Sequence, residues 1–574
     1  MNMKRILSLL LVLALLVSAA SAAYYEPFDH PEVPFSDMAY TGIDVDAAKD
    51  FCARFARDPV TLYPELLALY DDAYTQNALA YIRMCQNTGD AAYAEESAAS
   101  DSDLAAVGDL VYTALAEALQ GPSGDELSAL MPEGAGEAYA TYQPMADEES
   151  AAYDEEAALI RDYYLLPEDE SFADNAARLY LRLVELRREE AERAGYDSYS
   201  EYAYAVLFAR EYAPEEMSEL YRAVKKQLSP LLDRCAAALQ AAPPLRNDSV
   251  VPDGEEILRG LAAHLDEVSP ELEEAMAYLL RNRLYTIGSS DPLLDTGYTS
   301  YLAAWRAPYL FNRADSRFYA YLDAVHEFGH YNAAYHDPTP VLFQLDNMDV
   351  AELQSQGLEM LFLPCLQELL AGEDEEARAT VALSVLYEML SSVIDGCQYD
   401  EFEQEVYTAD NLSVEALHEL DRRLSAEYGY VYEEGDEPYW VNVSHLFSDP
   451  FYMISSAISA IPALDLYLRS LEDRAAAADA YLRISAARTN AWYFDVLYDN
   501  DLCDPTDASA LSRLFRGLNR QLAPLTGDSV TSQTYVWLIP AAGVALVGLL
   551  LLRRKFHRNR EAVNHADKQS ETTE

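Results

Sequence analysis

The chain has 574 residues, 51% of them hydrophobic, and a formal net charge of −58. This length and apolar content allow a large core and two or more lobes. The strongly acidic balance argues against nucleic acid and anionic membrane surfaces as partners, because both are bound through Lys and Arg. It favours cationic ligands, and the alternative is that it keeps an exposed protein soluble.

The first segment, residues 1–22, is predicted to be a secretory signal peptide. Lys4 and Arg5 precede the apolar run "ILSLLLVLALLV", and an Ala20-x-Ala22 step follows it. A short basic start, an apolar run and a small-residue cleavage site are typical of such a signal. We therefore expect the mature chain to begin after Ala22 and to work outside the cell.

Residues 23–250 are predicted to form an N-terminal helical lobe. The stretch "DNAARLYLRLVELRREEAERAG" has one broad apolar face and charged residues elsewhere, and Gly195 is its expected end. Glycine and proline interrupt the helices at "QGPSGD", "MPEGAGEAY" and "QAAPPLRNDSVVPDGEE", and the last stretch is the predicted lobe boundary. The biased stretch "AAYAEESAASDSDLAA", residues 91–106, is expected to be a flexible loop.

The six cysteines are spread along the chain without a C-x-x-C pair, which argues against zinc ribbons and thioredoxin-like redox sites. In an extracellular protein, six cysteines allow about 15 disulfide connectivities. The sequence does not choose among them.

Extended structure is sparse. "GYTSYLAAWRAPYLFN", residues 297–312, is the clearest extended stretch, with aromatic and β-branched residues between Gly and Pro. The sequence therefore predicts a mainly α fold with a small β-sheet beside the central motif.

That motif lies in "SRFYAYLDAVHEFGHYNAAY", a predicted helix that Ser316 caps and that ends before Asp337-Pro338. His326 and His330 are four residues apart and so lie on one face, where both rings can bind one zinc ion. Glu327 is close enough to act as a general base on a water bound to that ion. The H-E-x-x-H motif of metalloproteases combines two metal ligands and a general base in this way. The alternative is two partly buried histidines that only make hydrogen bonds.

A catalytic zinc ion needs a third protein ligand. "DVAELQSQGLEMLF" is predicted to be a second helix, closed by Pro364, in which Glu352 and Glu359 lie seven residues apart on one face. One glutamate can bind the metal while the other supports a ligand through a histidine N–H. Two solvated glutamates are the alternative.

"HEFGH", followed 22 residues after its second histidine by the first glutamate of "AELQSQGLE", resembles the oligoendopeptidase F and thimet oligopeptidase family of zinc peptidases. The resemblance implies one catalytic zinc ion held by His326, His330 and Glu352, with Glu359 behind the ligands. It implies two helical lobes around a deep channel, with a catalytic domain here at residues 251–528.

Two further segments are similar to this family. "GYTSYLAAWRAPYLFN" looks like the edge strand that pairs with the substrate backbone, which implies substrate contacts at Gly297, Tyr298 and Tyr301. "SHLFSDPFYMISSAIS" is similar to an element whose histidine and tyrosine stabilise the oxyanion, which implies these roles for His445 and Tyr452.

The chain departs from the family pattern at two positions. It has Ala333 where the family often has another histidine, and Ser456 where it often has a second tyrosine. Neither departure removes a metal ligand or the base. They are expected to affect substrate preference and turnover rather than the reaction itself.

The uncharged run "YVWLIPAAGVALVGLLLL", residues 535–552, has about the 18 to 20 residues that span a bilayer as a helix. Basic residues stay on the cytoplasmic side, so residues 553–574 are expected inside the cell, with 529–534 as a linker outside it. A buried core helix is the alternative. The sequence thus predicts a single-pass protein of the cell membrane with an extracellular N-terminal ectodomain.

These expectations combine into a membrane-anchored zinc endopeptidase that cleaves short extracellular oligopeptides. A dipeptidyl carboxypeptidase is an alternative that would need a positive group for the substrate carboxylate, with Arg306 and Arg313 as the nearest candidates. A non-enzymatic surface peptide-binding protein on the same scaffold is a further alternative. That alternative predicts loss of a metal ligand or of the base, yet the chain keeps all four residues, His326, Glu327, His330 and Glu352.

Overall fold

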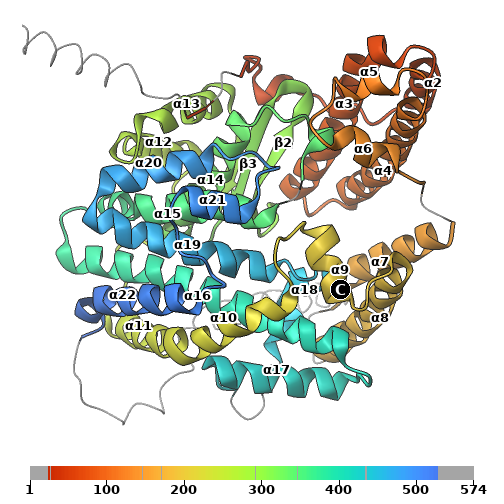
Figure 1. Cartoon of the computed structure of the whole chain (residues 1–574). Helices are drawn as coiled ribbons and strands as arrows, with labels where there is room; N and C mark the ends of the chain where they lie inside the picture. Colours follow the sequence, from red (N-terminus) through yellow and green to blue (C-terminus); the bar gives the residue numbers. More distant parts are fainter. Residues whose placement is uncertain are drawn as a thin grey trace, which may run out of the picture.

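The computed structural model describes residues 24–25, 28–144, 147–167, 169, 171–290, 292–345, 347–432 and 436–527. The predicted signal peptide, linker, transmembrane run and basic tail lie outside these residues. The described part is mainly helical with one small sheet, as the sequence predicts (Figure 1).

The first helices form a bundle with an apolar core of its own, drawn in red and orange in Figure 1. Fully buried Phe55, Leu66, Val111 and Leu115 belong to this core. The helices of the bundle are α2 (Val45–Phe55), α3 (Pro59–Gln86), α4 (Ala91–Leu119), α5 (Gly124–Ser128) and α6 (Ala135–Ala140).

The expected flexible loop at residues 91–106 is wrong, because the stretch belongs to the continuous helix α4. The Asp90 carboxylate caps the helix by accepting a hydrogen bond from Ala92 N–H. Ser97 and Ser100 are buried. Alanine is the best helix former, and α4 packs along α3, so local propensity and tertiary packing outweigh the polar composition.

The next group of helices packs against the C-terminal half of the chain. Both parts share one large apolar core, which includes Tyr180, Leu232, Leu310 and Leu518. This core spans both sides of residue 250, and the lobe boundary there stays a prediction. The helices are α7 (Asp147–Tyr164), α8 (Phe172–Ala194), α9 (Tyr199–Tyr202), α10 (Ser218–Ala223), α11 (Ser229–Ala241), α12 (Gly254–Ala262) and α13 (Glu273–Asn282).

The predicted end of α8 is confirmed, since Gly195 caps it in the left-handed conformation with φ of 84°. The stretch predicted to be a loop before residue 254 is also confirmed, because α11 ends at Ala241 and α12 begins at Gly254.

The sheet has three strands in the order β1-β3-β2: β1 (Tyr285–Gly288), β2 (Gly297–Leu302) and β3 (Ala307–Arg313). β1 pairs with β3 in parallel and β2 pairs with β3 antiparallel, with Gly297 opposite Asn312. The stretch predicted to be extended therefore forms a hairpin, whose first strand is at the edge of the sheet. Arg306 turns the chain at φ of 49°, and its carbonyl accepts a hydrogen bond from His30 Nδ1 at 2.7 Å, a contact that sequence spacing does not reveal.

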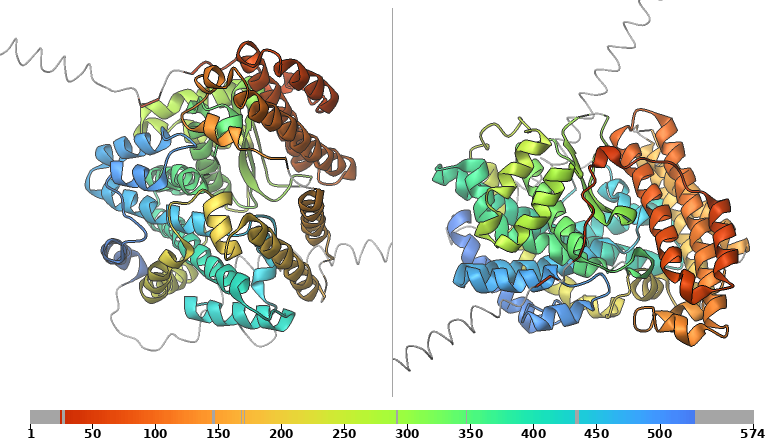
Figure 2. Two further views of the ribbon diagram at one scale, coloured as in Figure 1. Left: turned by 45° about the vertical axis from the view of Figure 1, so that its right-hand side comes forward. Right: turned by 90° about the horizontal axis from the view of Figure 1, so that it is seen from above.

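Four of the remaining helices build the centre of the molecule: α15 packs on α14, α16 and α19, and α16 packs on α19 (Figures 1 and 2). Gly396 permits close approach of α16 and α19, because a Cβ there would lie 2.4 Å from the Met453 carbonyl oxygen. The helices are α14 (Arg317–His336), α15 (Met348–Ala371), α16 (Glu375–Thr408), α17 (Val414–Tyr428), α18 (Ser444–Ser448), α19 (Met453–Glu472), α20 (Arg474–Ser485), α21 (Tyr493–Asp499) and α22 (Ala508–Thr526).

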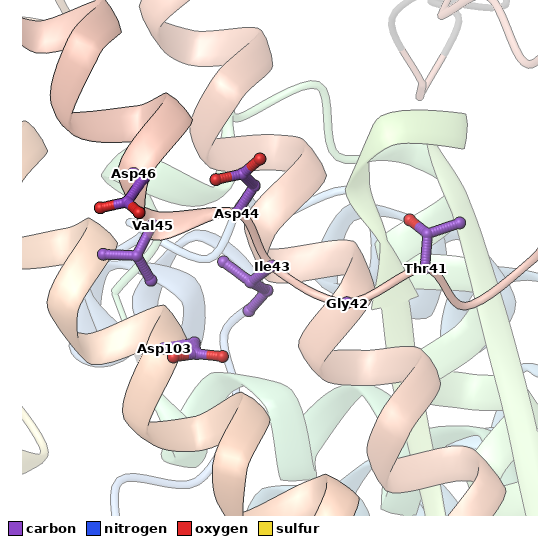
Figure 3. Close-up of a pocket in the computed structure, with 7 residues that line it drawn as sticks. All are labelled: Thr41, Gly42, Ile43, Asp44, Val45, Asp46 and Asp103. Carbon is purple, nitrogen blue, oxygen red and sulfur yellow. The ribbon is translucent and has the colours of Figure 1, made fainter.

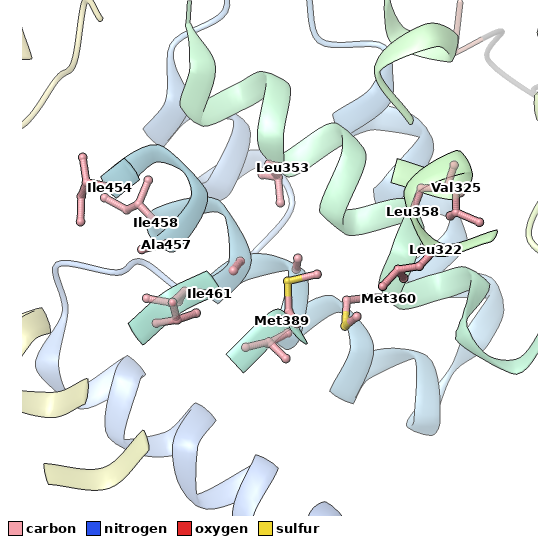
Figure 4. Close-up of a cluster of buried hydrophobic side chains, with 14 of the residues drawn as sticks. Leu322, Val325, Leu353, Leu358, Met360, Met389, Ile454, Ala457, Ile458 and Ile461 are labelled. Atoms are coloured by element: carbon pink, nitrogen blue, oxygen red, sulfur yellow. The ribbon is translucent and has the colours of Figure 1, made fainter. Parts of the chain in front are cut away.

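The core of this centre consists of side chains from all four packed helices (Figure 4). α14 contributes Val325, α15 contributes Leu353 and Leu358, α16 contributes Met389 and α19 contributes Ile458, and all five are at most 3% exposed. Each fully buried aliphatic side chain stabilises the fold by about 1.5–3 kcal/mol. This packing fixes α14 and α15, which carry the histidines and glutamates of the motif, against each other.

The prediction that Pro364 closes the second helix is wrong, because α15 continues through it to Ala371. A proline inside a helix removes a backbone hydrogen bond and costs about 3 kcal/mol. Leu366 and Leu370 beyond the proline are buried in the core, and this burial offsets the cost.

Among the described residues, α16 alone is long and apolar enough to cross a membrane by length and composition. It packs on α15 and α19, and its buried residues belong to the central core. We therefore assign α16 to the interior of the protein.

All six cysteines are buried and unpaired. None of the disulfide pairings that the cysteine count allows is formed in this structure.

Candidate metal centre

The two histidines lie on α14, whose predicted ends are confirmed. The Ser316 hydroxyl accepts a hydrogen bond from Tyr319 N–H at 3.2 Å, and the helix ends at His336. The four-residue spacing turns both rings to the same side, with the Nε2 atoms of His326 and His330 3.2 Å apart.

Gly329, between the two histidines, allows α15 to approach α14. A Cβ at this position would lie 2.6 Å from Ser355 Cα and 2.8 Å from the Gln354 carbonyl oxygen, closer than real Cβ atoms come. Any other residue would push the two helices apart. The missing side chain thus brings Glu352, one turn before Ser355, to the histidine pair.

The three proposed ligands converge. Glu352 Oε2 lies 3.5 Å from His326 Nε2 and 3.9 Å from His330 Nε2. Atoms bound at about 2.0–2.1 Å to a tetrahedral zinc ion lie roughly 3.3 Å apart. Small side-chain shifts would therefore bring the three ligand atoms to the separations that zinc requires. Two histidines and one carboxylate are a donor set of catalytic zinc sites, with the fourth position left for water and substrate. These residues therefore fit zinc.

Glu359 stands behind the histidines and orients one of them. Its Oε1 accepts a hydrogen bond from His326 Nδ1 at 2.6 Å, which turns His326 Nε2 toward Glu352. Glu359 and Glu352 share the face of α15 that their seven-residue spacing indicated. Glu352 is held in turn by Ser355, whose hydroxyl donates to Oε2 at 3.2 Å.

The protonation of the site before a metal binds follows from these contacts. Burial lowers the pKa of His326, but the hydrogen bond and charge of Glu359 outweigh it and raise that pKa to about 10. Burial lowers the pKa of His330 to about 4, which leaves its ring neutral. Burial raises the pKa of Glu352, but both histidines and Tyr452 oppose this and the net shift is downward. Metal uptake should therefore displace a proton from His326.

Glu327 is buried beside the histidines and against strand β2. The Thr299 hydroxyl lies 2.9 Å from both the Glu327 backbone carbonyl and Oε2, which fixes the carboxylate. A Cβ at Gly297 would lie 3.1 Å from Glu327 Oε1, so the glycine leaves room for this side chain. Burial raises the pKa of Glu327 to about 7, a value suited to a general base.

The three predicted substrate contacts on β2 separate in the structure. Gly297 is exposed and lies beside Glu327. The Tyr298 ring stacks on Phe311 at 5.1 Å, and Tyr301 packs against the core of the first helix bundle. Thr299, which sequence reasoning missed, shares the face of Gly297 by strand alternation, and that two-residue spacing could have indicated it.

Tyr452 contacts a proposed metal ligand, and His445 lies beside Tyr452. The Tyr452 hydroxyl donates a hydrogen bond to Glu352 Oε1 at 2.5 Å, and the His445 and Tyr452 ring centroids are 4.5 Å apart. Buried Arg187 holds the helix that carries His445, since it donates hydrogen bonds to the carbonyls of Leu446 and Phe447. The structure thus brings two hydrogen-bond donors to the edge of the metal centre.

Further acidic side chains near the centre escaped sequence reasoning. Asp323 lies one turn before His326 on α14, and burial raises its pKa well above the ordinary value. Glu388 on α16 accepts a hydrogen bond from the Tyr319 hydroxyl at 2.8 Å, and burial raises its pKa to about 7. The spacing of Tyr319, Asp323 and His326 on one helix face was readable, whereas Glu388 approaches only through tertiary packing.

A second group of metal-type donors consists of His264, Glu267 and Cys365. His264 Nδ1 already pairs with Glu267 at 2.7 Å. Arg474 Nη2 lies 4.0 Å from Cys365 Sγ, and its positive charge opposes a cation there. The candidate metal centre is therefore the group on α14 and α15.

The structure also has a pocket at the start of α2, lined by Asp44, Asp46 and Asp103 among others (Figure 3). The Asp44 carboxylate serves as the cap of α2 by accepting a hydrogen bond from Ala47 N–H. The pocket contains no residue of the metal centre.

Replacing Gly329 with alanine is expected to separate α14 from α15 and to weaken metal binding. The added methyl group should lower the free energy of unfolding by about 1–3 kcal/mol, as overpacking does. Gly108→Ala is the matched control, because a Cβ inside α4 meets only ordinary contacts at 3.6 Å. Chemical denaturation and zinc titration of both variants test this, and unchanged zinc affinity in Gly329→Ala would contradict it.

No family model matches the sequence, and the search of curated proteins found no match. Solved structures do match. A protein provisionally named oligoendopeptidase F has a TM-score of 0.72 at 20% identity, covering 85% of this chain and 98% of its own. PZ peptidase A with an inhibitor and a provisionally named oligoendopeptidase F from Bacillus anthracis each have a TM-score of 0.69 at 19% identity, covering 86% of this chain and 98% of theirs. This chain therefore has the fold of oligoendopeptidase F structures.

Proposed function

We propose that this chain is a zinc-dependent endopeptidase that hydrolyses short oligopeptides outside the cell, anchored through the run at residues 535–552. One observation carries the proposal: two histidines and a glutamate converge at distances that fit zinc, with a buried carboxylate beside them. The fold shared with oligoendopeptidase F structures supports it.

Glu327 is the proposed general base. When bound, zinc would supply a water of lowered pKa and polarise the scissile carbonyl. The Glu327 carboxylate would accept the proton of the attacking water and pass it to the leaving amine. Thr299 holds the carboxylate for this transfer, and Gly297 leaves it space.

Tyr452 and His445 are the proposed oxyanion donors. Burial raises the pKa of Tyr452 well above its ordinary value, as does the charge of Glu352, so the phenol keeps its proton and can donate it in a hydrogen bond. A substrate carbonyl at the centre would compete with Glu352 for this donor. One such donor lowers the barrier by about 3–4 kcal/mol.

The proposed substrates are extended peptides in a deep channel between two lobes, which would exclude folded proteins. Among the residues that the structure describes, strand β2 is at the edge of the sheet and pairs only with β3. An extended peptide could add to this edge through main-chain hydrogen bonds, which gives affinity with little sequence preference.

The carboxypeptidase alternative gains no support from its two candidate arginines. The Arg306 guanidinium lies over Phe28, and Arg313 donates a hydrogen bond to the Leu293 carbonyl at 2.8 Å. Both side chains thus make contacts outside the metal centre. A non-enzymatic binding protein is likewise less consistent with the convergence of the ligands and base.

Zinc removal and return test the proposal on the full-length protein. Purified protein should contain zinc, lose cleavage of a mixed peptide pool after chelation, and regain it when zinc is added back. A folded protein substrate should stay intact throughout. Peptides that remain uncut by the zinc-loaded protein would overturn the proposed function.

C-terminally amidated peptides distinguish the endopeptidase hypothesis from the dipeptidyl carboxypeptidase hypothesis. An endopeptidase should cut a peptide and its C-terminally amidated form at equal rates. A dipeptidyl carboxypeptidase should lose activity on the amide, because it needs the free carboxylate.

A further inference from the structure

Phe451, directly before Tyr452, has a left-handed backbone with φ of 67°. Bulky residues rarely adopt this conformation, and it persists only where the surroundings hold it. Phe451 is fully buried, and its ring lies 5.4 Å from that of Tyr407. The strained residue is therefore locked into the core immediately before a proposed oxyanion donor.

Two buried side chains from distant parts of the chain hold the main chain of Phe451. Its N–H donates a hydrogen bond to Glu403 Oε2 on α16 at 2.8 Å. Its carbonyl accepts one from Arg210 Nη2 at 2.7 Å, and the same nitrogen donates to Ser455 Oγ in the first turn of α19 at 2.8 Å. Both main-chain polar groups of Phe451 are thus hydrogen-bonded to buried side chains.

Arg210 also reaches the helix that carries the third ligand. Its Nε lies 3.7 Å from Asp349 Oδ1, one turn before Glu352 on α15. The guanidinium is fully enclosed, with Tyr204 and Phe208 rings 4.4 Å from its carbon. A buried charge is costly unless it is paired and hydrogen-bonded, and here Asp349 pairs with the guanidinium while the Phe451 carbonyl and Ser455 accept its hydrogen bonds. These contacts tie α15 to the start of α19 through Arg210.

We infer that Arg210 and Glu403 are positioning residues that hold Phe451 in its left-handed conformation and thereby aim the Tyr452 hydroxyl at the metal centre. Relaxation of Phe451 to a negative φ would rotate the chain at Tyr452 and move a hydroxyl that now lies 2.5 Å from Glu352. Arg210 touches neither a metal ligand nor the reacting atoms. It acts through Tyr452.

The inference rests on the proposed peptidase function, and Arg210→Met in the full-length protein tests it. Misplacing an oriented group by about 1 Å can cost about 100-fold, so we expect kcat to fall by about 10- to 100-fold. KM for a short peptide should change less than about twofold, and bound zinc should be unchanged, since the ligands remain. If the parent protein does not cleave peptides, the proposed function is wrong. If the parent is active and Arg210→Met has an unchanged kcat, only this inference is wrong.

A double-mutant cycle with Tyr452→Phe separates positioning from general damage. If Arg210 acts through the Tyr452 hydroxyl, Arg210→Met should lower kcat by less than about twofold once that hydroxyl is gone. If the double variant instead loses the product of the two single-variant losses in kcat, the two residues act independently and the inference is overturned.

Conservative variants and a matched control complete the test. Glu403→Gln keeps an oxygen that accepts the Phe451 N–H and should retain most of kcat, whereas Glu403→Met should lose it as Arg210→Met does. Arg188→Met is the control, because Arg188 also donates to two carbonyls, those of Val406 and Ala409, but away from Tyr452. Should Arg210→Met fail to fold, Arg210→Lys keeps the buried charge, and its kcat loss must vanish in the Tyr452→Phe background.

Discussion

Glu327→Gln is expected to lower kcat/KM for peptide cleavage by about 100- to 10,000-fold, the range that a general base contributes. The amide has the size of the carboxylate but cannot take a proton from water. Its oxygen can still accept the Thr299 hydrogen bond, so the local structure should persist. Zinc content should also persist, because His326, His330 and Glu352 are untouched.

Zinc analysis alongside peptide kinetics checks this result. Glu388→Gln is the matched control, since it makes the same change on a carboxyl whose burial also raises its pKa to about 7. Glu388 bonds to Tyr319 rather than to the metal ligands, and the control should keep most of the activity. A Glu327→Gln protein that cuts peptides as fast as its parent would show that another group is the base.

Glu352→Gln should abolish stoichiometric zinc binding, and with it activity at limiting zinc. The substitution removes the one negative charge among the three proposed ligands, on a side chain that is 5% exposed and lies near both histidines. We expect zinc affinity to fall by more than the about 10- to 100-fold that loss of an outer partner costs.

Glu359→Gln provides the graded comparison. Glu359 contacts His326 Nδ1 and is not itself a proposed ligand. The loss of zinc affinity in Glu359→Gln should therefore stay within that range of about 10- to 100-fold. Competition titration against a zinc-binding dye measures all three proteins. Equal affinities of Glu352→Gln and the parent would remove Glu352 from the ligand set.

The helices of the motif were predictable because their signals are local. Ser316 and the Asp337-Pro338 step mark the ends of α14, and the spacing of His326 and His330 places them on one face. The relation of Glu352 to Glu359 on α15 follows from the same periodicity. These residues lie within a few turns of one another, so backbone geometry alone relates them.

Predictions failed where a composition or turn signal did not decide the local structure. Residues 91–106 were predicted to be a flexible loop, yet they form part of α4, because the helix propensity of alanine and packing against α3 both favour a helix. Pro364 read as a helix end, yet burial of the following turns keeps α15 intact. In the β2–β3 hairpin, a non-glycine residue makes the turn, so no glycine signal marked it.

The sequence by itself determined that two histidines and a glutamate share one turn of a helix, because helical periodicity relates residues four apart. Only the tertiary structure decided that Glu352 meets this pair across the contact at Gly329, that Thr299 holds Glu327, and that Tyr452 reaches Glu352. It also decided that Arg210 and Glu403, 241 and 48 residues from Phe451, fix the backbone that leads to Tyr452. Such contacts depend on how separate helices pack, and no local pattern in the chain records that.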